Sequence, residues 1–264
     1  MTAEKDPGLM ADIAALTHPG KVREGNEDCL GIGDWISCEA LTTPRIFRQI
    51  LGSVPLLCVV ADGMGGHAAG EVASHQATEQ LLAMGVRLSL LASCWVDCLR
   101  EIHTALFARM DAMPVLRSMG TTVAGLALTE DQALVFNIGD SRVYRGRDGF
   151  LTQLSTDDVR HAHYGQSDGH SRNHALSQCL GGPIRSAIDP HSLSLRLAIG
   201  DFWLLTSDGI TDLLDIDVLE AAITPNDPAR TVAILAEQAL AAGGLDNLSL
   251  IAVRIHALND GFAS

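Results

Sequence analysis

The chain has 264 residues, with 18 Lys and Arg against 32 Asp and Glu, so its formal net charge is −14 at pH 7. A hydrophobic fraction of 47% supplies enough apolar material for a folded core and excludes disordered and collagen-like classes. The acidity argues against nucleic acid as a partner, because phosphate backbones are bound by clustered Lys and Arg.

Nothing in the sequence predicts export or membrane insertion. The first twenty residues hold no apolar stretch as long as a signal peptide, and no run of about 18 apolar residues predicts a membrane span. The six cysteines form no CxxC pair, which favours small buried hydrophobic residues over a zinc site. We therefore expect a cytoplasmic protein with reduced thiols.

Apolar runs bounded by Gly, Asp or Pro predict strands along most of the chain. They lie at 12–17, 28–33, 56–61, 121–129, 133–145, 192–199, 201–207 and 248–257. Helical periodicity appears at 70–88, 90–112, 217–223 and 227–242, and Asp227-Pro228 has the form of a helix cap followed by Pro at the first helical position.

The strands cluster around a central helix pair and do not alternate regularly with helices. This order favours an α+β layer fold with antiparallel sheets over a doubly wound parallel sheet. No linker divides the chain, so we expect one domain. The stretches 34–55 and 158–175 show neither helical nor strand periodicity, and we expect both to lie at the surface.

Acidic residues recur at the boundaries of the predicted strands. Asp62, Asp140 and Asp208 each follow an apolar strand and stand beside glycine or in a Gly-Asp pair, while Glu27-Asp28 and Asp246 precede strands. In antiparallel sheets the end of one strand lies beside the start of its neighbour, so all these sites can meet at one edge.

Six carboxylates at one edge would repel each other unless cations neutralised them. Ligand sets made only of oxygen suit hard cations such as Mg²⁺ or Mn²⁺. Any single Asp-Gly pair is explained more simply as a turn, but five acidic sites at strand boundaries favour a metal centre. A phosphate-binding loop is excluded at Gly65–Gly70, because Glu71 stands where Lys is required.

Six blocks of the sequence together resemble a known family. They are Thr17–Asp28, Val59–Ser74, Met119–Leu128, Asn137–Arg145, Leu204–Leu214 and Gly243–Val253. In this order they resemble the signature blocks of the bacterial metal-dependent Ser/Thr protein phosphatases, the type 2C or PPM family. The resemblance implies a four-layer α-β-β-α fold, in which a central pair of antiparallel β-sheets is flanked by pairs of helices.

The resemblance also implies how the chain is organised. It implies a single phosphatase catalytic domain over residues 1–264, with its core at about 12–257 and the family's flap at about 158–175. An insertion at about 34–55 is longer and more apolar than the family leads us to expect. We expect it to be a covering loop, with a docking surface as the alternative.

The resemblance assigns roles to the acidic residues and to one arginine. Asp62 would bridge two tightly bound Mn²⁺ or Mg²⁺ ions, and Asp28 would orient the water between them. The implied metal ligands are Glu27, Asp62 and the Gly63 carbonyl at one ion, Asp62, Asp208 and Asp246 at the other, and Asp140 with Asp208 at a weaker third site. Arg23 would grip the substrate phosphate, because a guanidinium offers planar, bidentate donors.

The implied reaction is hydrolysis of phosphoserine and phosphothreonine in proteins by a water that the two metals activate, reversing a Ser/Thr kinase. Phosphorylated proteins and a cognate kinase are therefore the expected partners, and we expect a monomer. Two alternatives stay open: a hydrolase of small phosphate esters, and a catalytically weak pseudophosphatase that binds phosphoproteins. The second predicts lost metal ligands, yet all six acidic positions and Arg23 are present.

The chain departs from the family pattern at several positions. Met64 stands where eukaryotic relatives have a His that can protonate the leaving alcohol, so no side chain is assigned as general acid. Asp158-Val159 stands where the family has His-Ser. The four His residues within 158–175 are expected to be solvated, and His67 is expected to make a structural hydrogen bond.

Overall fold

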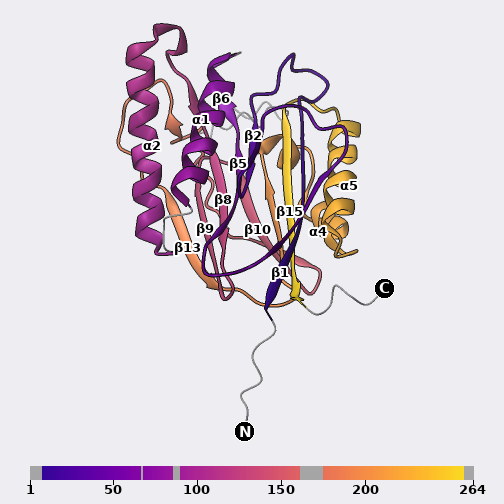
Figure 1. Ribbon diagram of the computed structural model, residues 1–264. Helices are drawn as coiled ribbons and strands as arrows, with labels where there is room; N and C mark the ends of the chain where they lie inside the picture. The colour runs from indigo at the N-terminus through magenta and orange to yellow at the C-terminus, as the bar shows by residue number, and fades with distance from the viewer. Residues whose placement is uncertain (1–7, 67, 86–89, 161–174, 259–264) are drawn as a thin grey trace.

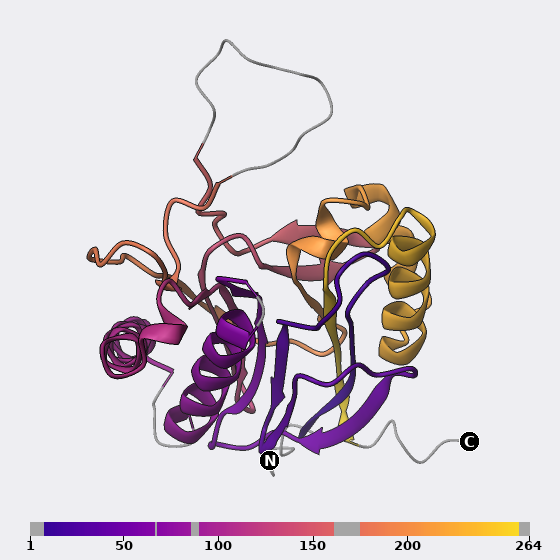
Figure 2. The same cartoon turned by 90° about the horizontal axis from the view of Figure 1, so that it is seen from above.

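The computed structural model describes residues 8–66, 68–85, 90–160 and 175–258. The predicted four-layer fold is confirmed: two antiparallel β-sheets pack face to face, with helices on their outer faces (Figure 1). Viewed from above, α1 (Ala68–Gly85) and α2 (Ala92–Ala112) cover one sheet, and α5 (Pro228–Ala241) covers the other (Figure 2). Of the predicted sites, His67 and the four His residues of 158–175 (His161, His163, His170 and His174) lie outside the described residues.

Each large sheet has six strands. The first has the order β11 (Phe150–Gln153), β10 (Arg142–Arg147), β14 (Phe202–Thr206), β15 (Leu248–Ala257), β1 (Leu9–His18) and β4 (Arg45–Ile50). The second has the order β13 (His191–Arg196), β9 (Gln132–Ile138), β8 (Val123–Leu128), β5 (Leu56–Ala61), β2 (Cys29–Ile32) and β3 (Trp35–Ser37).

Shorter elements complete the described structure. A third sheet joins β12 (Leu180–Gly181), β7 (Gly120–Thr121) and β6 (Gly63–Met64). The remaining helices are the 3₁₀ turn at Pro114–Leu116, α3 (Asp208–Thr211) and α4 (Ile216–Ile223). None of the helices in the described ranges is long and apolar enough to cross a membrane.

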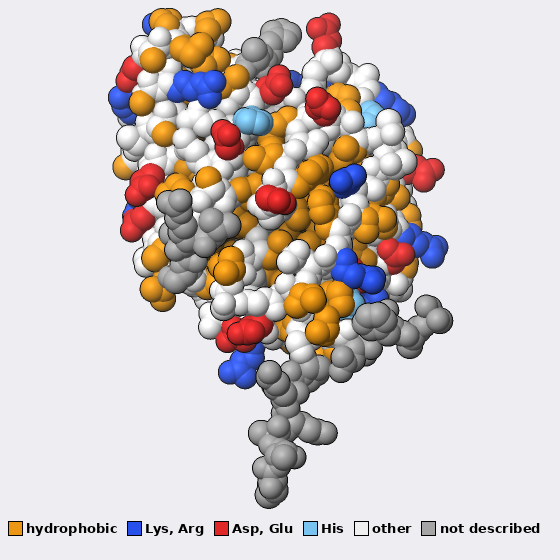
Figure 3. All heavy atoms as spheres, viewed as in Figure 1, with side chains coloured by type: hydrophobic (Ala, Val, Ile, Leu, Met, Phe, Trp, Pro, Cys, Tyr) orange, Lys and Arg blue, Asp and Glu red, His pale blue; other side chains and the backbone are white. Residues whose placement is uncertain are grey.

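The central strands bury both faces, which explains why they read as continuous apolar runs. In β14, Trp203 and Leu205 point into the core between the two sheets, while Phe202 and Leu204 point to the core beneath α4 and α5. Successive side chains of a strand point to opposite faces, so each central strand serves two cores. Figure 3 shows hydrophobic side chains along the middle of the face seen in Figure 1, between the flanking helix layers.

The predicted cap of α5 is confirmed. The Asp227 side chain accepts hydrogen bonds from the backbone N–H groups of Ala229 and Arg230, and Pro228 occupies the first turn. Such a cap satisfies donors that the first helical turn leaves free. It fixes where α5 begins on the first sheet.

The strand predicted at 133–145 is wrong, because the structure has two strands there. β9 belongs to the second sheet and β10 to the first, and the chain crosses between the sheets at Gly139, Asp140 and Ser141. Gly139 has a φ of 97°, and a Cβ on it would meet the Thr122 side chain at 2.6 Å. A residue with a side chain is excluded at this crossover, which brings Asp140 to the end of both sheets.

The stretch 34–55 is also different from the covering loop that we expected. It contributes β3 and β4, which are edge strands of the two sheets. Trp35 and Phe47 are in contact across the two edges, with ring centroids 5.2 Å apart. The outer residues Ile46 and Ile50 remain exposed. Because β4 mixes exposed apolar residues with charged ones, its sequence lacks the regular alternation of apolar and polar residues that predicts a strand.

Candidate metal centre

Asp62 lies between β5 and β6, where its backbone is held by two threonines. Its carbonyl oxygen accepts from the Thr121 hydroxyl at 2.9 Å and from the Thr122 backbone N–H at 2.9 Å. Its own N–H donates to the Thr122 hydroxyl at 3.2 Å. Because every backbone polar group of Asp62 is paired within the described structure, its carboxylate is presented from a rigid position.

Asp28 is fully buried at the start of β2 and is tied to the first sheet through serine hydroxyls. Ser207 donates to Asp28 Oδ2 at 2.9 Å and accepts from the Ser249 backbone N–H at 3.0 Å. Ser207 directly precedes Asp208, so the same contact aligns the two acidic residues. The other oxygen, Asp28 Oδ1, has no hydrogen-bond partner among the described residues.

Asn247 fastens the segment that carries Glu27. Its side-chain oxygen accepts from the Glu27 backbone N–H at 2.8 Å, and its amide donates to the carbonyls of Pro19 and Gly25 at 3.0 and 2.8 Å. The sequence analysis gave Asn247 no role. An Asn that follows an Asp at the start of a strand is a signal for side-chain to backbone bonding, but it does not reveal the distant partner.

Two glycines let the start of α1 approach Glu27. A Cβ on Gly70 would overlap the Glu27 carboxylate, and a Cβ on Gly63 would overlap the carbonyl oxygens of Gly70 and Glu27. The Ser74 hydroxyl also donates to the Glu27 carbonyl at 2.6 Å. The Glu27 side chain is therefore held beside Gly63, which carries the predicted carbonyl ligand.

Four aspartates of the cluster have raised pKa values. Burial is the main cause, and neighbouring carboxylates add to it. The pKa is raised to about 7 for Asp28 and Asp140, to about 6 for Asp208, and well above its usual range for Asp62. Each of these pKa values is raised in part by neighbouring carboxylates, which places Asp28, Asp62, Asp140, Asp208 and Asp246 within electrostatic reach of one another.

Arg23 is a cation that reaches this cluster. Its guanidinium donates to Asp246 Oδ2 at 2.6 Å, and that bond is the main cause that raises the pKa of Arg23. Glu27 and Asp62 also raise it, although burial opposes them. Arg23 therefore lies at the predicted site, but its partner here is a predicted metal ligand.

The donor set fits divalent cations by its chemistry. It offers carboxylate oxygens, which hard cations prefer, and Oδ1 of both Asp28 and Asp208 is buried without a partner in the described structure. No three His, Cys, Asp or Glu side chains in the described ranges are already arranged around one point. Asp246 instead contacts Arg23, and Asp62 shares a hydrogen bond with Asp208.

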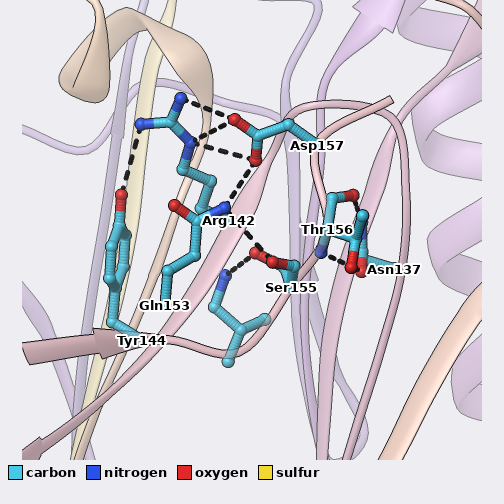
Figure 4. Close-up of polar contacts among 8 residues, drawn as sticks. Asn137, Arg142, Tyr144, Gln153, Ser155, Thr156 and Asp157 are labelled. Carbon is cyan, nitrogen blue, oxygen red and sulfur yellow. Dashed lines mark hydrogen bonds and ion pairs between the residues drawn. The ribbon is translucent and has the colours of Figure 1, made fainter. Parts of the chain in front are cut away.

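A polar network supports the strands that flank Asp140 (Figure 4). Arg142 donates from Nε and an NH₂ group to the Asp157 carboxylate at 2.7–3.1 Å, and Gln153 donates to the same carboxylate at 2.6 Å. Asn137 exchanges two hydrogen bonds with the Thr156 backbone. The segment after β11 is thus bound to both β9 and β10, on either side of the crossover that carries Asp140.

Asp158, where the chain departs from the family pattern, is a further residue that the sequence analysis left without a role. It is 7% exposed, and its carboxylate accepts from the Gly139 backbone N–H at 2.9 Å and from the Gln178 side chain at 2.7 Å. The Nε2 atom of His191 lies 2.9 Å from Oδ1. Asp158 therefore holds the residue next to Asp140.

The ends of the predicted flap form a short antiparallel stem. Val159 and Leu176 form an isolated β-bridge, the Arg160 N–H donates to the Ala175 carbonyl, and the Ser177 N–H donates to the Asp158 carbonyl, both at 2.8 Å. The middle of the flap lies outside the described residues.

Comparison with known proteins identifies relatives of the chain. The family model described as "Protein phosphatase 2C" matches residues 45–241. The serine/threonine protein phosphatase PstP of Mycobacterium tuberculosis is 32% identical over 259 residues, which is 92% of this chain and 45% of that protein. The protein phosphatase PhpP of Streptococcus pneumoniae is 27% identical over 258 residues, or 93% of this chain and 98% of that protein. The chain thus spans about half the length of PstP.

Solved structures are similar over nearly the whole chain. The catalytic domain of PstP, in complex with two manganese ions, superposes with a TM-score of 0.74 at 28% identity, covering 94% of this chain and 99% of that one. PppA of Pseudomonas aeruginosa, described as a regulatory component of a type VI secretion system, gives a TM-score of 0.72 at 28% identity, covering 93% and 97%.

Proposed function

This chain belongs to the protein phosphatase 2C family, and from that premise we propose that it hydrolyses phosphoserine and phosphothreonine in proteins with the help of divalent metal ions. The observation that carries the proposal is the cluster of buried and half-buried, mutually repelling carboxylates at one end of the two sheets. Repulsion of this kind is costly in a folded chain unless cations offset it.

The proposed ligands are those that the family resemblance implies. Asp62, Glu27 and the Gly63 carbonyl would hold one ion, and Asp62, Asp208 and Asp246 would hold the other. When bound, two Mn²⁺ or Mg²⁺ ions lower the pKa of a water and offset charge on the phosphoryl oxygens. Asp140, together with Asp208, is the proposed weaker third site. The family's use of divalent metals, with two manganese ions in PstP, supports the first two sites.

The chain's own residues bind and orient the reactants. Asp28, held by Ser207, orients the attacking water in line with the scissile P–O bond. Arg23 turns from Asp246 to the substrate phosphate, where its planar donors match two phosphoryl oxygens. Breaking the ion pair between Arg23 and Asp246 costs little free energy, because the two side chains are 55% and 38% exposed. Exposed ion pairs contribute only about 0–1 kcal/mol to stability.

The biological setting belongs to the same proposal. Phosphorylated proteins are the substrates, a Ser/Thr kinase that modifies the same proteins is the opposing partner, and the chain works as a monomer in the cytoplasm. A single catalytic domain with its core at about 12–257 is supported by the similarity to the solved catalytic domain of PstP over 94% of the chain.

Phosphate release tests the proposed reaction. We expect the chain to release phosphate from phosphothreonine and phosphoserine peptides with Mn²⁺ or Mg²⁺, and to lose this activity in EDTA. Asp208→Asn removes a negative ligand and is expected to lose at least about 10- to 100-fold at limiting Mn²⁺. Asp217→Asn, an exposed acid in the first turn of α4, is the matched control and is expected to behave like the parent.

Two other results identify the alternative functions. Turnover of an aryl phosphate without turnover of any phosphopeptide would assign the chain to small phosphate esters. Binding of phosphopeptides without turnover in any metal would identify a pseudophosphatase. Either result contradicts the proposal.

A further inference from the structure

A pocket of about 400 Å³ lies beside the carboxylate cluster, and neither the proposed reaction nor the metal ligands use it. Its apolar lining consists of Met64, Leu176, Cys179, Pro183, Ile184 and Ile188. Its volume lies within the range of pockets that hold small ligands. We call it the Met64 pocket.

The floor of the Met64 pocket is closely packed backbone. Gly181 and Gly182 both have positive φ, and the Gly182 N–H donates to the Met119 carbonyl at 2.8 Å. A Cβ on Gly181 would meet the same carbonyl oxygen at 2.6 Å. Side chains are therefore excluded from this floor, which is why an open hollow remains between the stem of the flap and residues 183–188.

The Met64 pocket adjoins the segment that carries Asp62 and Gly63. Met64 directly follows Gly63 in β6, and β7, which pairs with β6 and β12, carries the Thr121 hydroxyl that binds the Asp62 carbonyl. On the other side, Gln178 lines the pocket and binds the Asp158 carboxylate. A phosphorylated residue held by the proposed metal ligands would therefore have its chain neighbours within reach of this pocket.

Charge and polarity restrict what can bind there. Of the residues that line the pocket, all in the described part of the chain, Arg160 is the charged one. A basic side chain would be repelled by Arg160, and one cation among apolar walls is a poor match for a second phosphate group. A large apolar side chain suits the walls, and an acidic neighbour suits the rim.

We propose that the Met64 pocket binds an apolar side chain of the phosphoprotein substrate, next to the phosphorylated residue, and so contributes to sequence preference. This inference rests on the proposed phosphatase function. Burying an apolar side chain excludes water from both surfaces, and hydrophobic pockets that discriminate side-chain size typically do so by about 10- to 200-fold. Ile184, which is 66% exposed at the rim, would be covered by the bound substrate.

Paired phosphopeptides test the proposal. We would measure kcat/KM for phosphothreonine peptides that carry Leu or Ala at each of the two positions on either side. The parent chain is expected to prefer Leu by about tenfold at one position. Ile184→Asp, which puts charge at the rim, and Ser186→Trp, which fills the pocket, are both expected to reduce that ratio to about one.

Two controls separate binding from folding and chemistry. Ile199→Asp replaces an isoleucine that is 54% exposed in the turn between β13 and β14, outside the pocket, and is expected to keep the Leu preference. Aryl phosphate turnover, which needs no peptide contact, is expected to stay within about twofold in all variants, as is usual where substitutions lie outside the reacting centre.

The outcomes distinguish the inference from the function on which it rests. Equal kcat/KM for Leu and Ala peptides in the parent chain, or an unchanged preference in both pocket variants, would overturn the assignment of the Met64 pocket alone. Aryl phosphate turnover with no phosphopeptide turnover would overturn the proposed function and this inference with it.

Discussion

Arg23 and Arg48 form ion pairs of the same length but of different proposed importance. Each guanidinium lies 2.6 Å from an aspartate, and the two arginine side chains are 55% and 59% exposed. Arg23 contacts Asp246 of the carboxylate cluster. Arg48, on the edge strand β4, contacts Asp12 on the neighbouring strand β1. Replacing each arginine by alanine therefore compares the loss of the same kind of ion pair inside and outside the proposed site.

For Arg23→Ala we expect a higher KM for phosphopeptides with little change in kcat. Loss of a charge-assisted contact costs about 1.5–3 kcal/mol, or roughly 10- to 150-fold in kcat/KM. Affinity for Mn²⁺ is expected to stay the same or to rise, because Asp246 loses a competing cation. Steady-state kinetics and a metal titration measure both effects. If Arg23→Ala and Arg48→Ala have the same small effect, Arg23 is only a surface ion pair.

Asp140 allows a prediction about the third metal site. Its position at the crossover between the sheets, where burial and Asp208 raise its pKa to about 7, places it at the edge of the cluster. For Asp140→Ala we expect the two tight metal sites to remain and phosphopeptide turnover to fall by about tenfold. Calorimetric Mn²⁺ titration beside kinetics measures this. Loss of a tight site would make Asp140 a core ligand, and full activity would make it a turn residue.

At the scale of elements, the stem of the flap is coupled to the metal cluster through Asp158. Asp158→Ala leaves the buried Gly139 N–H, one N–H of the Gln178 amide and His191 Nε2 without their partner. This loss is expected to cost about 1–3 kcal/mol of folding stability. Because Asp158 acts by holding the residue next to Asp140, we also expect turnover of phosphopeptides to fall. Chemical denaturation and steady-state kinetics measure the two effects.

A double-mutant cycle identifies the route of this coupling. When Asp140 is already Ala, adding Asp158→Ala is expected to lower stability but to have little further effect on turnover, because both changes remove the same function. If the two losses of turnover multiply, Asp158 acts on the reaction without Asp140.

Much of the arrangement of elements was predictable, because each central strand is an apolar run with a polar boundary. The two failures have physical causes. The single strand predicted at 133–145 passed over the polar segment Gly139–Arg142, which separates two apolar stretches. Gly-Asp-Ser is typical of a turn, but the contact of Gly139 with Thr122, where the chain changes sheet, is not encoded locally. The edge strand β4, with the sequence Arg-Ile-Phe-Arg-Gln-Ile, carries polar and apolar residues on both faces and is mostly exposed, so it shows no clear alternation of buried and exposed positions.

The proximity of the aspartates was predictable for the same reason, since strand ends of antiparallel sheets meet, while their roles as metal ligands stay a prediction. Their supports were not predictable. Ser207, Asn247 and Asp158 bind partners that are 179, 220 and 19 residues away in the sequence. A single small polar residue carries no signal of such a distant contact. The contact between Arg23 and Asp246 is equally non-local.

At the scale of the whole molecule, the raised pKa values predict how stability depends on pH. An aspartate whose pKa is raised on folding stabilises the fold fully below its unfolded pKa of about 4, and this contribution is lost as pH rises through the folded pKa. Asp208, Asp28 and Asp140 have folded pKa values of about 6 to 7. The chain stripped of metal with EDTA is therefore expected to lose stability between about pH 4 and 7.

Thermal unfolding at pH 5.5 and 7.5 measures this effect. The stripped chain is expected to melt at a lower temperature at pH 7.5, and Mn²⁺ is expected to remove most of the difference, since a ligand of the folded state stabilises it. Added salt is the control, because it screens the general repulsion of a chain with net charge −14 more than that of a buried cluster. A higher melting temperature at pH 7.5 in the stripped chain would contradict the prediction.

The most direct test of a two-metal phosphatase is to count the ions and the turnover together in the parent chain and in Asp62→Asn. Calorimetric titration of the stripped parent with Mn²⁺ is expected to give two tight ions per chain, with phosphopeptide hydrolysis appearing as they bind. Asp62→Asn removes the proposed bridging charge, so we expect at most one tight ion and loss of hydrolysis by at least about 100-fold. Two tight ions with near-parental turnover in Asp62→Asn would contradict the proposed centre.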